Sequence, residues 1–178
     1  VRVGVINDRI IEFNGLLADG VAYSDQLERL RYAVKMITVL LGASGAGKST
    51  WVHNNKTGFE HIYNIDAIRA IKDMDVNAYT RHMRTKAIMA VETGQPLIAD
   101  ACHLLKMHRF LWLALAERLQ LDTQLIVFDT RRELLLQAQQ IREFPVKNSV
   151  VINQHIHMQR AKNDVKREGW GSIEVITR

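Results

Sequence analysis

The chain is poor in cysteine and proline and has no long apolar run. Its single cysteine, Cys102, excludes an internal disulfide, so nothing points to an oxidising compartment. With two prolines and no Gly/Ser-rich linker, nothing indicates a second full domain. No apolar stretch approaches bilayer thickness, and the charged first residues, VRVGVINDRIIEF, do not resemble a signal peptide. We therefore expect a cytoplasmic protein that does not enter the membrane.

The composition is that of a globular domain with a modest basic excess. Of the 178 residues, 47% are hydrophobic and 24% are charged, and the formal net charge is +5. Residues 131–178 contain nine Lys or Arg against five Asp or Glu. Two interpretations fit: a site for polyanions, including nucleic acid, or a solvated helical face beside a site that binds the phosphates of a small nucleotide.

Residues 1–35 differ in pattern from the rest. Apolar and polar residues alternate around Asn7 and Asp8, which predicts a hairpin, and SDQLERLRYAVK predicts a helix with Ser24 as its N-cap. We expect residues 1–35 to be an N-terminal extension. It is either an appendage packed on the main domain or a translated stretch upstream of a start at Met36.

From residue 36 onward, short apolar segments alternate with longer segments of helical periodicity. The expected strands cover residues 36–41, 61–65, 96–99, 123–128 and 172–176. Strands that alternate with helices predict an α/β fold, in which helices cover both faces of a parallel sheet. We expect this domain to span residues 36–178.

The segment MITVLLGASGAGKSTW contains a phosphate-binding loop. Its GASGAGKS matches the motif G-x-x-x-x-G-K-[ST], between an apolar strand and a helix-compatible segment. Backbone N–H groups of such a loop bind phosphate oxygens, so we expect Lys48 to reach the outer phosphates and the Ser49 hydroxyl to bind Mg²⁺. The sequence thus predicts a site for ATP or another NTP, with Mg²⁺. The residues expected to contact the nucleotide are Gly42, Ala43, Ser44, Gly45, Ala46, Gly47, Lys48, Ser49 and Thr50.

Acidic residues end two of the other expected strands. Asp66 follows HIYNI, and Arg69, three residues later, shares its helical face, so both can point into the cleft at the carboxyl ends of the strands. There Asp66 can take a proton from an attacking hydroxyl and Arg69 can hold an anionic group; an N-cap Asp beside a surface Arg is the alternative. Asp100 ends PLIAD, where it can orient Mg²⁺, hold the Asp66–Arg69 pair, or cap the next segment.

Five segments in order resemble a known family. They are GASGAGKSTW, YNIDAIR, LIAD, LIVFDTRRELLLQAQQIREFPVKNSVV and REGWGSIEVI. They are similar to the phage-type 5′-hydroxyl polynucleotide kinases and equally to the broader group of zeta-toxin-like or AAA_33-type small P-loop kinases. The resemblance covers roughly residues 36–176 and implies an adenylate-kinase-like core.

The resemblance implies transfer of the γ-phosphoryl group of ATP to a nucleic-acid 5′-OH. It implies that Asp66 is the general base, that Arg69 holds the phosphate next to the acceptor nucleotide, and that Asp100 is the acid at the end of the third core strand. It further implies a lid around residues 131–160 in which Arg142 clamps the transferring phosphate. A solvated helix-end arginine is the alternative for Arg142.

The chain departs from the family pattern on the acceptor side. Ala138 occupies the place of a further lid arginine, and Ala101 and Cys102 replace the polar pair after Asp100. Three hypotheses follow: a polynucleotide 5′-hydroxyl kinase; a kinase of a nucleoside, a nucleotide, another small hydroxyl metabolite or a hydroxymethylated base in DNA; and a non-catalytic nucleotide-binding regulatory protein. The first, with Lys48, Asp66, Arg69 and Arg142 as catalytic residues and Ser49 and Asp100 as metal ligands, is the leading one.

Overall fold

The computed structural model describes residues 36–55, 61–64 and 76–178. The predicted N-terminal extension of residues 1–35 lies outside these residues, as do Asp66 and Arg69. Within the part of the chain that the structure describes, no helix combines the length and apolar character needed to cross a bilayer.

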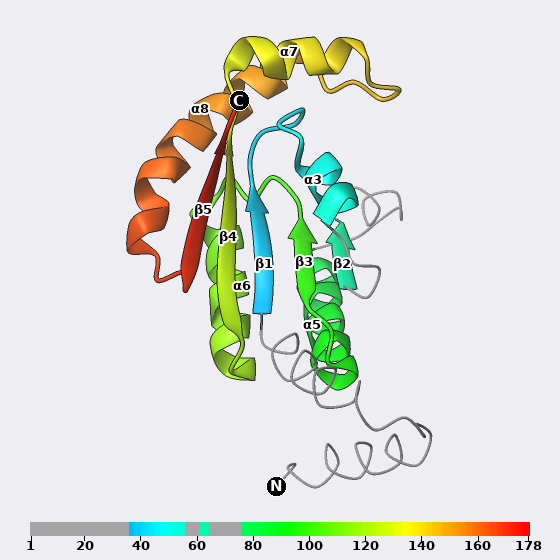
Figure 1. The fold of residues 1–178 in the computed structure, drawn as a ribbon, viewed down its shortest axis with the longest axis vertical. Helices are drawn as coiled ribbons and strands as arrows, with labels where there is room; N and C mark the ends of the chain where they lie inside the picture. The colour runs from blue at the N-terminus through cyan, green and yellow to red at the C-terminus, as the bar shows by residue number, and fades with distance from the viewer. Residues whose placement is uncertain (1–35, 56–60, 65–75) are drawn as a thin grey trace, which may run out of the picture. The chain divides into compact units, whose positions relative to one another are not determined.

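Five parallel strands form one sheet, in the order β2-β3-β1-β4-β5 (Figure 1). The α/β fold with a parallel sheet that the sequence predicts is confirmed. Each strand lies within a residue of its predicted bounds: β1 Met36–Leu41, β2 His61–Asn64, β3 Leu97–Asp100, β4 Asp122–Asp129 and β5 Ser172–Thr177.

Strand β1 is the centre of the sheet because its side chains are apolar on both faces. Ile37 pairs in register with Leu97 of β3, and Val39 pairs with Leu125 of β4. Every residue of β1 after Met36 is buried. A near-continuous apolar run of this kind is typical of a parallel strand covered by helices on both sides.

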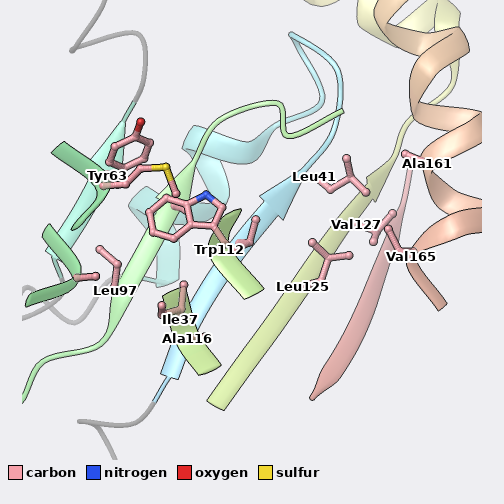
Figure 2. Close-up of a cluster of buried hydrophobic side chains, with 14 of the residues drawn as sticks. Ile37, Leu41, Tyr63, Leu97, Trp112, Ala116, Leu125, Val127, Ala161 and Val165 are labelled. Carbon is pink, nitrogen blue, oxygen red and sulfur yellow. The ribbon is translucent and has the colours of Figure 1, made fainter. Parts of the chain in front are cut away.

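One face of the sheet is covered by two long helices, α5 (Val76–Thr93) and α6 (Lys106–Leu119), which run behind the sheet in Figure 1. Figure 2 shows the core they form with the strands, and Trp112 of α6 lies in its middle. The rings of Trp112 and Tyr63 meet edge to face, with 5.2 Å between centroids.

Two shorter helices, α3 (Lys48–Asn55) and α7 (Arg132–Gln140), contribute to the core on the opposite face. Val52 of α3 and Leu135 of α7 pack on the side chains of β1 and β4 that point away from Trp112. The long helix α8 (Asn148–Asp164) contributes to both cores and leads through η1 (Val165–Arg167) to β5. In Figure 1, α7 lies across the end of the sheet to which the strands point.

Neighbouring strands β1 and β3 send the chain to opposite faces of the sheet. The loop after β1 enters α3, whereas the loop after β3 leads to α6. In an open parallel sheet, the crevice between two such loops is where ligands bind. The fold therefore places residues 42–47 and residues 101–105 on the two sides of one crevice.

Candidate functional site

The loop after β1 has the backbone that its glycines predict. Gly45 and Gly47 have φ angles of +89° and +92°, which side-chain-bearing residues rarely adopt. Helix α3 begins directly afterwards at Lys48, and the Trp51 N–H donates to the Gly47 carbonyl at 2.9 Å. The first N–H groups of α3 therefore remain available to an anion at the start of the helix.

Lys48 is folded back over its own loop. Its Nζ donates to the carbonyl oxygens of Gly42 and Ala43 at 3.0 and 2.9 Å, and it lies 3.7 Å from Sγ of Cys102. The side chain is 8% exposed, so these carbonyls replace the water that the ammonium would otherwise bind. A phosphate oxygen can exchange with the carbonyls, because both are acceptors for the same N–H groups.

Asp100 links the loop after β1 to the ends of β3 and β2. Its Oδ2 accepts hydrogen bonds from Ser49 Oγ at 2.9 Å and from Asn64 Nδ2 at 3.1 Å. The carboxylate is buried, and hydroxyl and carboxylate oxygens are the kind of ligand that Mg²⁺ prefers. Sequence reasoning paired Ser49 with Asp100 but missed Asn64, although a polar residue at a strand's carboxyl end was the available signal.

The loop after β3 is held in place from inside the protein by His103. Trp112 Nε1, which can only donate, bonds to His103 Nε2 at 2.9 Å, so His103 carries its proton on Nδ1 and donates it to the Leu40 carbonyl at 2.8 Å. Burial, aided by nearby positive side chains including Lys48, lowers the pKa of His103 to about 4, despite the hydrogen bond to Leu40. His103 is therefore a neutral bridge between β1 and α6.

Arg109 anchors the same loop. Its Nη1 donates to the carbonyls of His103 and Leu104, both at 2.9 Å, while Nε and Nη2 form a two-pronged ion pair with Glu168. The guanidinium is 1% exposed and the Glu168 side chain 4%. Burial opposes the charge on Glu168, but hydrogen bonds from Arg109 and Trp170 outweigh it and lower the pKa of the carboxyl.

Helices α7 and α8 approach the phosphate-binding loop at Ser44. Gln154 Oε1 accepts from the Ser44 N–H at 2.8 Å, and Gln139 Nε2 donates to the Ser44 carbonyl at 3.2 Å. Sequence reasoning singled out Ala138 in this helix but missed the contacts of Gln139 and Gln154. Arg142, beyond the end of α7, is exposed.

These parts line a cavity of about 650 Å³. One wall is formed by the loop after β1 and the start of α3, a second by residues 100–105 with His108, and a third by residues of α7, α8 and the segment between them. The structure thus brings Lys48, Ser49, Asp100 and Arg142 to one cavity. Asp66 and Arg69 lie outside the described residues, so their place relative to this cavity stays a prediction.

A second cavity, of about 430 Å³, lies between the end of β4 and the end of β5. Residues 129–133, His155 and Arg178 line it, and a Cβ built on Gly47 would lie 2.6 Å from Arg178 Nη1. The Arg178 guanidinium therefore touches the phosphate-binding loop. At its floor, Asp129 pairs with Lys162, whose hydrogen bond lowers the pKa of Asp129 although burial opposes this.

A family profile and two solved structures agree with this architecture. Residues 37–164 match the AAA_33 family profile, described as an AAA domain. Kti12 from Chaetomium thermophilum, solved in complex with ADP-AlF3, has a TM-score of 0.54 and 15% identity over 79% of this chain and 88% of that one. A gluconokinase from Sinorhizobium meliloti 1021 has a TM-score of 0.50 and 12% identity over 81% of this chain and 83% of that one.

No curated protein matches the sequence. The identities to the two solved structures show likeness of fold alone. The family profile, in contrast, matches more than two thirds of the chain. The chain therefore belongs to the AAA_33 family, a family of small P-loop kinases.

Proposed function

We propose that the protein transfers the γ-phosphoryl group of ATP or another NTP, with Mg²⁺, to a hydroxyl group, and that this hydroxyl is the 5′-OH end of a polynucleotide. The part of the proposal that concerns the phosphate donor is supported by the 2.9 Å hydrogen bond between Ser49 Oγ and Asp100 Oδ2, beside the Lys48 ammonium. A P-loop hydroxyl, a strand-end carboxylate and a lysine in one cavity form the donor set that phosphoryl transfer uses.

Mg²⁺ fits this donor set. Ser49 and Asp100 would hold it, and Asn64 orients the Asp100 carboxylate by donating to Oδ2. Bound there, Mg²⁺ neutralises charge on the phosphate oxygens of the nucleotide.

The chain's own cations act on the phosphate groups. Lys48 exchanges the carbonyls of Gly42 and Ala43 for phosphate oxygens and stabilises the charge that develops during transfer. Arg142 lies on another wall of the same cavity, from which its guanidinium can bind the transferring group. The α3 N-terminus adds partial positive charge without a side chain.

The second cavity suits the nucleoside part of the donor. It adjoins the phosphate-binding loop through Arg178, and His155, Gln159 and Thr177 are among the residues that line it. The polar groups of these side chains can form hydrogen bonds with a base or a ribose.

The residues that would act on the acceptor are inferred from the sequence. Asp66 is proposed as the general base that takes the proton of the attacking hydroxyl, and Arg69 as the residue that holds the phosphate next to the acceptor. The basic excess of residues 131–178 favours an acceptor that carries several phosphates.

A second candidate is a compact acceptor, such as a nucleoside or a hexonate. It is favoured by the third cavity wall, where four of six side chains are apolar: Ala138, Ile141, Val146 and Val150, beside Arg142 and Gln154. An apolar wall offers a polyanion no counter-charge but packs well against a base or a carbon skeleton.

The test is transfer of radiolabelled γ-phosphoryl from ATP to a 5′-OH oligonucleotide, compared with nucleosides and gluconate in parallel. Wild type should label the oligonucleotide, and Asp66→Asn should reduce labelling by about 10²-fold or more. Asp122→Asn is the matched control, because Asp122 is exposed at the start of β4. Equal labelling by wild type and Asp66→Asn would refute the role of Asp66.

Two further measurements identify the class of acceptor and show whether the protein transfers phosphate at all. A polynucleotide held through several phosphates loses affinity steeply as salt is raised, whereas a compact acceptor with at most one charge loses little. Label on a nucleoside or gluconate alone would favour the compact acceptor. Tight ATP binding without any labelled product would favour the non-catalytic hypothesis.

A further inference from the structure

The backbone of Ser44, in the phosphate-binding loop, is held from two sides. Its N–H donates to Gln154 of α8 at 2.8 Å, and its carbonyl accepts from Gln139 of α7 at 3.2 Å. Two successive peptide groups of the phosphate-binding loop are thus bound to side chains about 100 positions away in the chain.

Gln139 has a second partner on its other side. Its Oε1 accepts the N–H of Val146 at 3.1 Å, and its Nε2 also donates to the Leu135 carbonyl at 3.1 Å. The side chain is 4% exposed, so each bond is shielded from water and costly to leave unmade. One amide group therefore joins the phosphate-binding loop to residues 141–147, the segment between α7 and α8 that contains Arg142.

The fit between α7 and the loop leaves little room for independent movement. A Cβ built on Gly45 would lie 2.6 Å from Gln139 Nε2 and 3.1 Å from both Ala138 Cβ and the Leu135 carbonyl oxygen. Glycine is thus required at position 45 by the approach of α7 as well as by its φ angle of +89°. A shift of the Ser44–Gly45 backbone must be accompanied by a shift of Gln139.

We propose that Gln139 is a positioning residue that couples nucleotide binding in the phosphate-binding loop to the position of segment 141–147. A phosphate that draws Lys48 away from the carbonyls of Gly42 and Ala43 changes the path of the adjoining Ser44 peptide. Gln139 transmits this change to Val146. The consequence for Arg142 rests on the proposed function, whereas the coupling itself requires nucleotide binding only.

The first test measures amide hydrogen exchange of Val146 by NMR, with and without saturating Mg-ADP. In wild type the exchange rate of Val146 should change about fivefold or more when Mg-ADP binds. In Gln139→Met, which keeps side-chain length but has no amide, Val146 should exchange fast in both states while Mg-ADP still binds. Gln140→Met is the matched control, because Gln140 is exposed on the same helix.

The wild-type measurement alone can refute the coupling, so the test does not depend on whether Gln139→Met folds. An unchanged Val146 exchange rate in wild type, with Mg-ADP bound, would overturn the proposal. A Gln139→Met protein whose Val146 responds to Mg-ADP as wild type does would overturn it as well.

The second test is a double-mutant cycle on phosphoryl transfer with Arg142→Ala. If Gln139 acts through Arg142, Gln139→Met should lower kcat about tenfold when Arg142 is present. It should have little further effect on kcat when it is combined with Arg142→Ala. Additive losses would show that Gln139 does not act through Arg142. If no acceptor is phosphorylated, the proposed function fails, and the exchange experiment still reports on the coupling.

Discussion

The loops after β1 and β3 line the same cavity, but they are held in different ways. The loop after β1, residues 42–47, is held mainly through its backbone, by glycine conformations and by Lys48 bonded to two of its carbonyls. The loop after β3, residues 101–105, is held by the buried side chains of His103 and Arg109.

This difference suggests different tasks for the two loops. Hydrogen bonds from Lys48 can be exchanged for bonds to a phosphate, so the first loop can adapt to its ligand. The bonds of Arg109 and His103 leave no acceptor for a ligand and are shielded from water, so the second loop forms a fixed wall. Substitutions in the first loop should therefore affect the reaction, and substitutions that release the second loop should affect stability.

The largest expected effect is a loss of phosphoryl-transfer rate when Lys48 is removed from the first loop. Lys48→Met should lower phosphoryl transfer by about 10⁴-fold, equivalent to about 5.4 kcal/mol of activation free energy, because the charge on the transferring group loses its lysine. The free energy of unfolding should change by less than about 1.5 kcal/mol, since the loss is limited to hydrogen bonds to two carbonyls and a weak contact with Cys102 Sγ. Steady-state kinetics and urea denaturation measure the two quantities.

The control for this prediction is Lys166→Met, because Lys166 is exposed in η1. It should leave both the rate and the stability near wild type. A Lys48→Met protein that keeps more than a tenth of the wild-type rate would show that the first loop does not act through Lys48.

The second loop should show the opposite pattern. Arg109→Met should lower the free energy of unfolding by about 4 kcal/mol, because it leaves the Glu168 carboxylate buried without its ion-pair partner and removes the donor to the carbonyls of His103 and Leu104. The double variant Arg109→Met/Glu168→Leu should recover part of the loss, since it removes the unpaired charge. Urea denaturation at pH 7 measures all three proteins.

A half-exposed ion pair allows the stability contribution of the buried Arg109–Glu168 pair to be compared with that of an exposed one. Lys162 pairs with Asp129 and its side chain is 40% exposed, so Lys162→Met should cost less than about 1 kcal/mol. If Arg109→Met costs no more than Lys162→Met, then the buried pair does not hold the second loop.

The same contrast explains how much of the molecule could be predicted from the sequence. The strands, the parallel sheet and the glycines of the first loop depend on local patterns, and the structure confirms the sheet. The pairing of Ser49 with Asp100 follows from a motif and from the rule that strand ends meet at one edge.

Contacts between residues that are distant in the chain could not be predicted. Arg109 and Glu168 lie 59 positions apart, and Ser44 and Gln154 lie 110 apart. Each residue alone resembles an ordinary polar residue of a helix or turn, because its partner is fixed only when the sheet order and the helix packing are known. The acceptor residues Asp66 and Arg69 remain predictions for a different reason, since they lie outside the described residues.

The smallest of the three effects depends on pH and again concerns the second loop. The pKa of His103 is about 4 in the folded protein and near 6.5 in the unfolded chain, so between these values only the unfolded chain binds the proton. The stability that neutral His103 provides is therefore complete above about pH 6.5 and is lost as the pH falls toward 4, by about 3 kcal/mol in total.

His103→Asn isolates this contribution. Asparagine can still donate to the Leu40 carbonyl, tolerates the φ angle of 44° at this position and does not titrate. The carboxyls with lowered pKa, Asp129 and Glu168, titrate in both proteins and cancel in the difference. Urea denaturation from pH 7 to pH 4 should thus show a steeper loss in wild type than in His103→Asn. Parallel curves would mean that burial does not keep His103 neutral. The link between the second loop and β1 would then not depend on neutral His103.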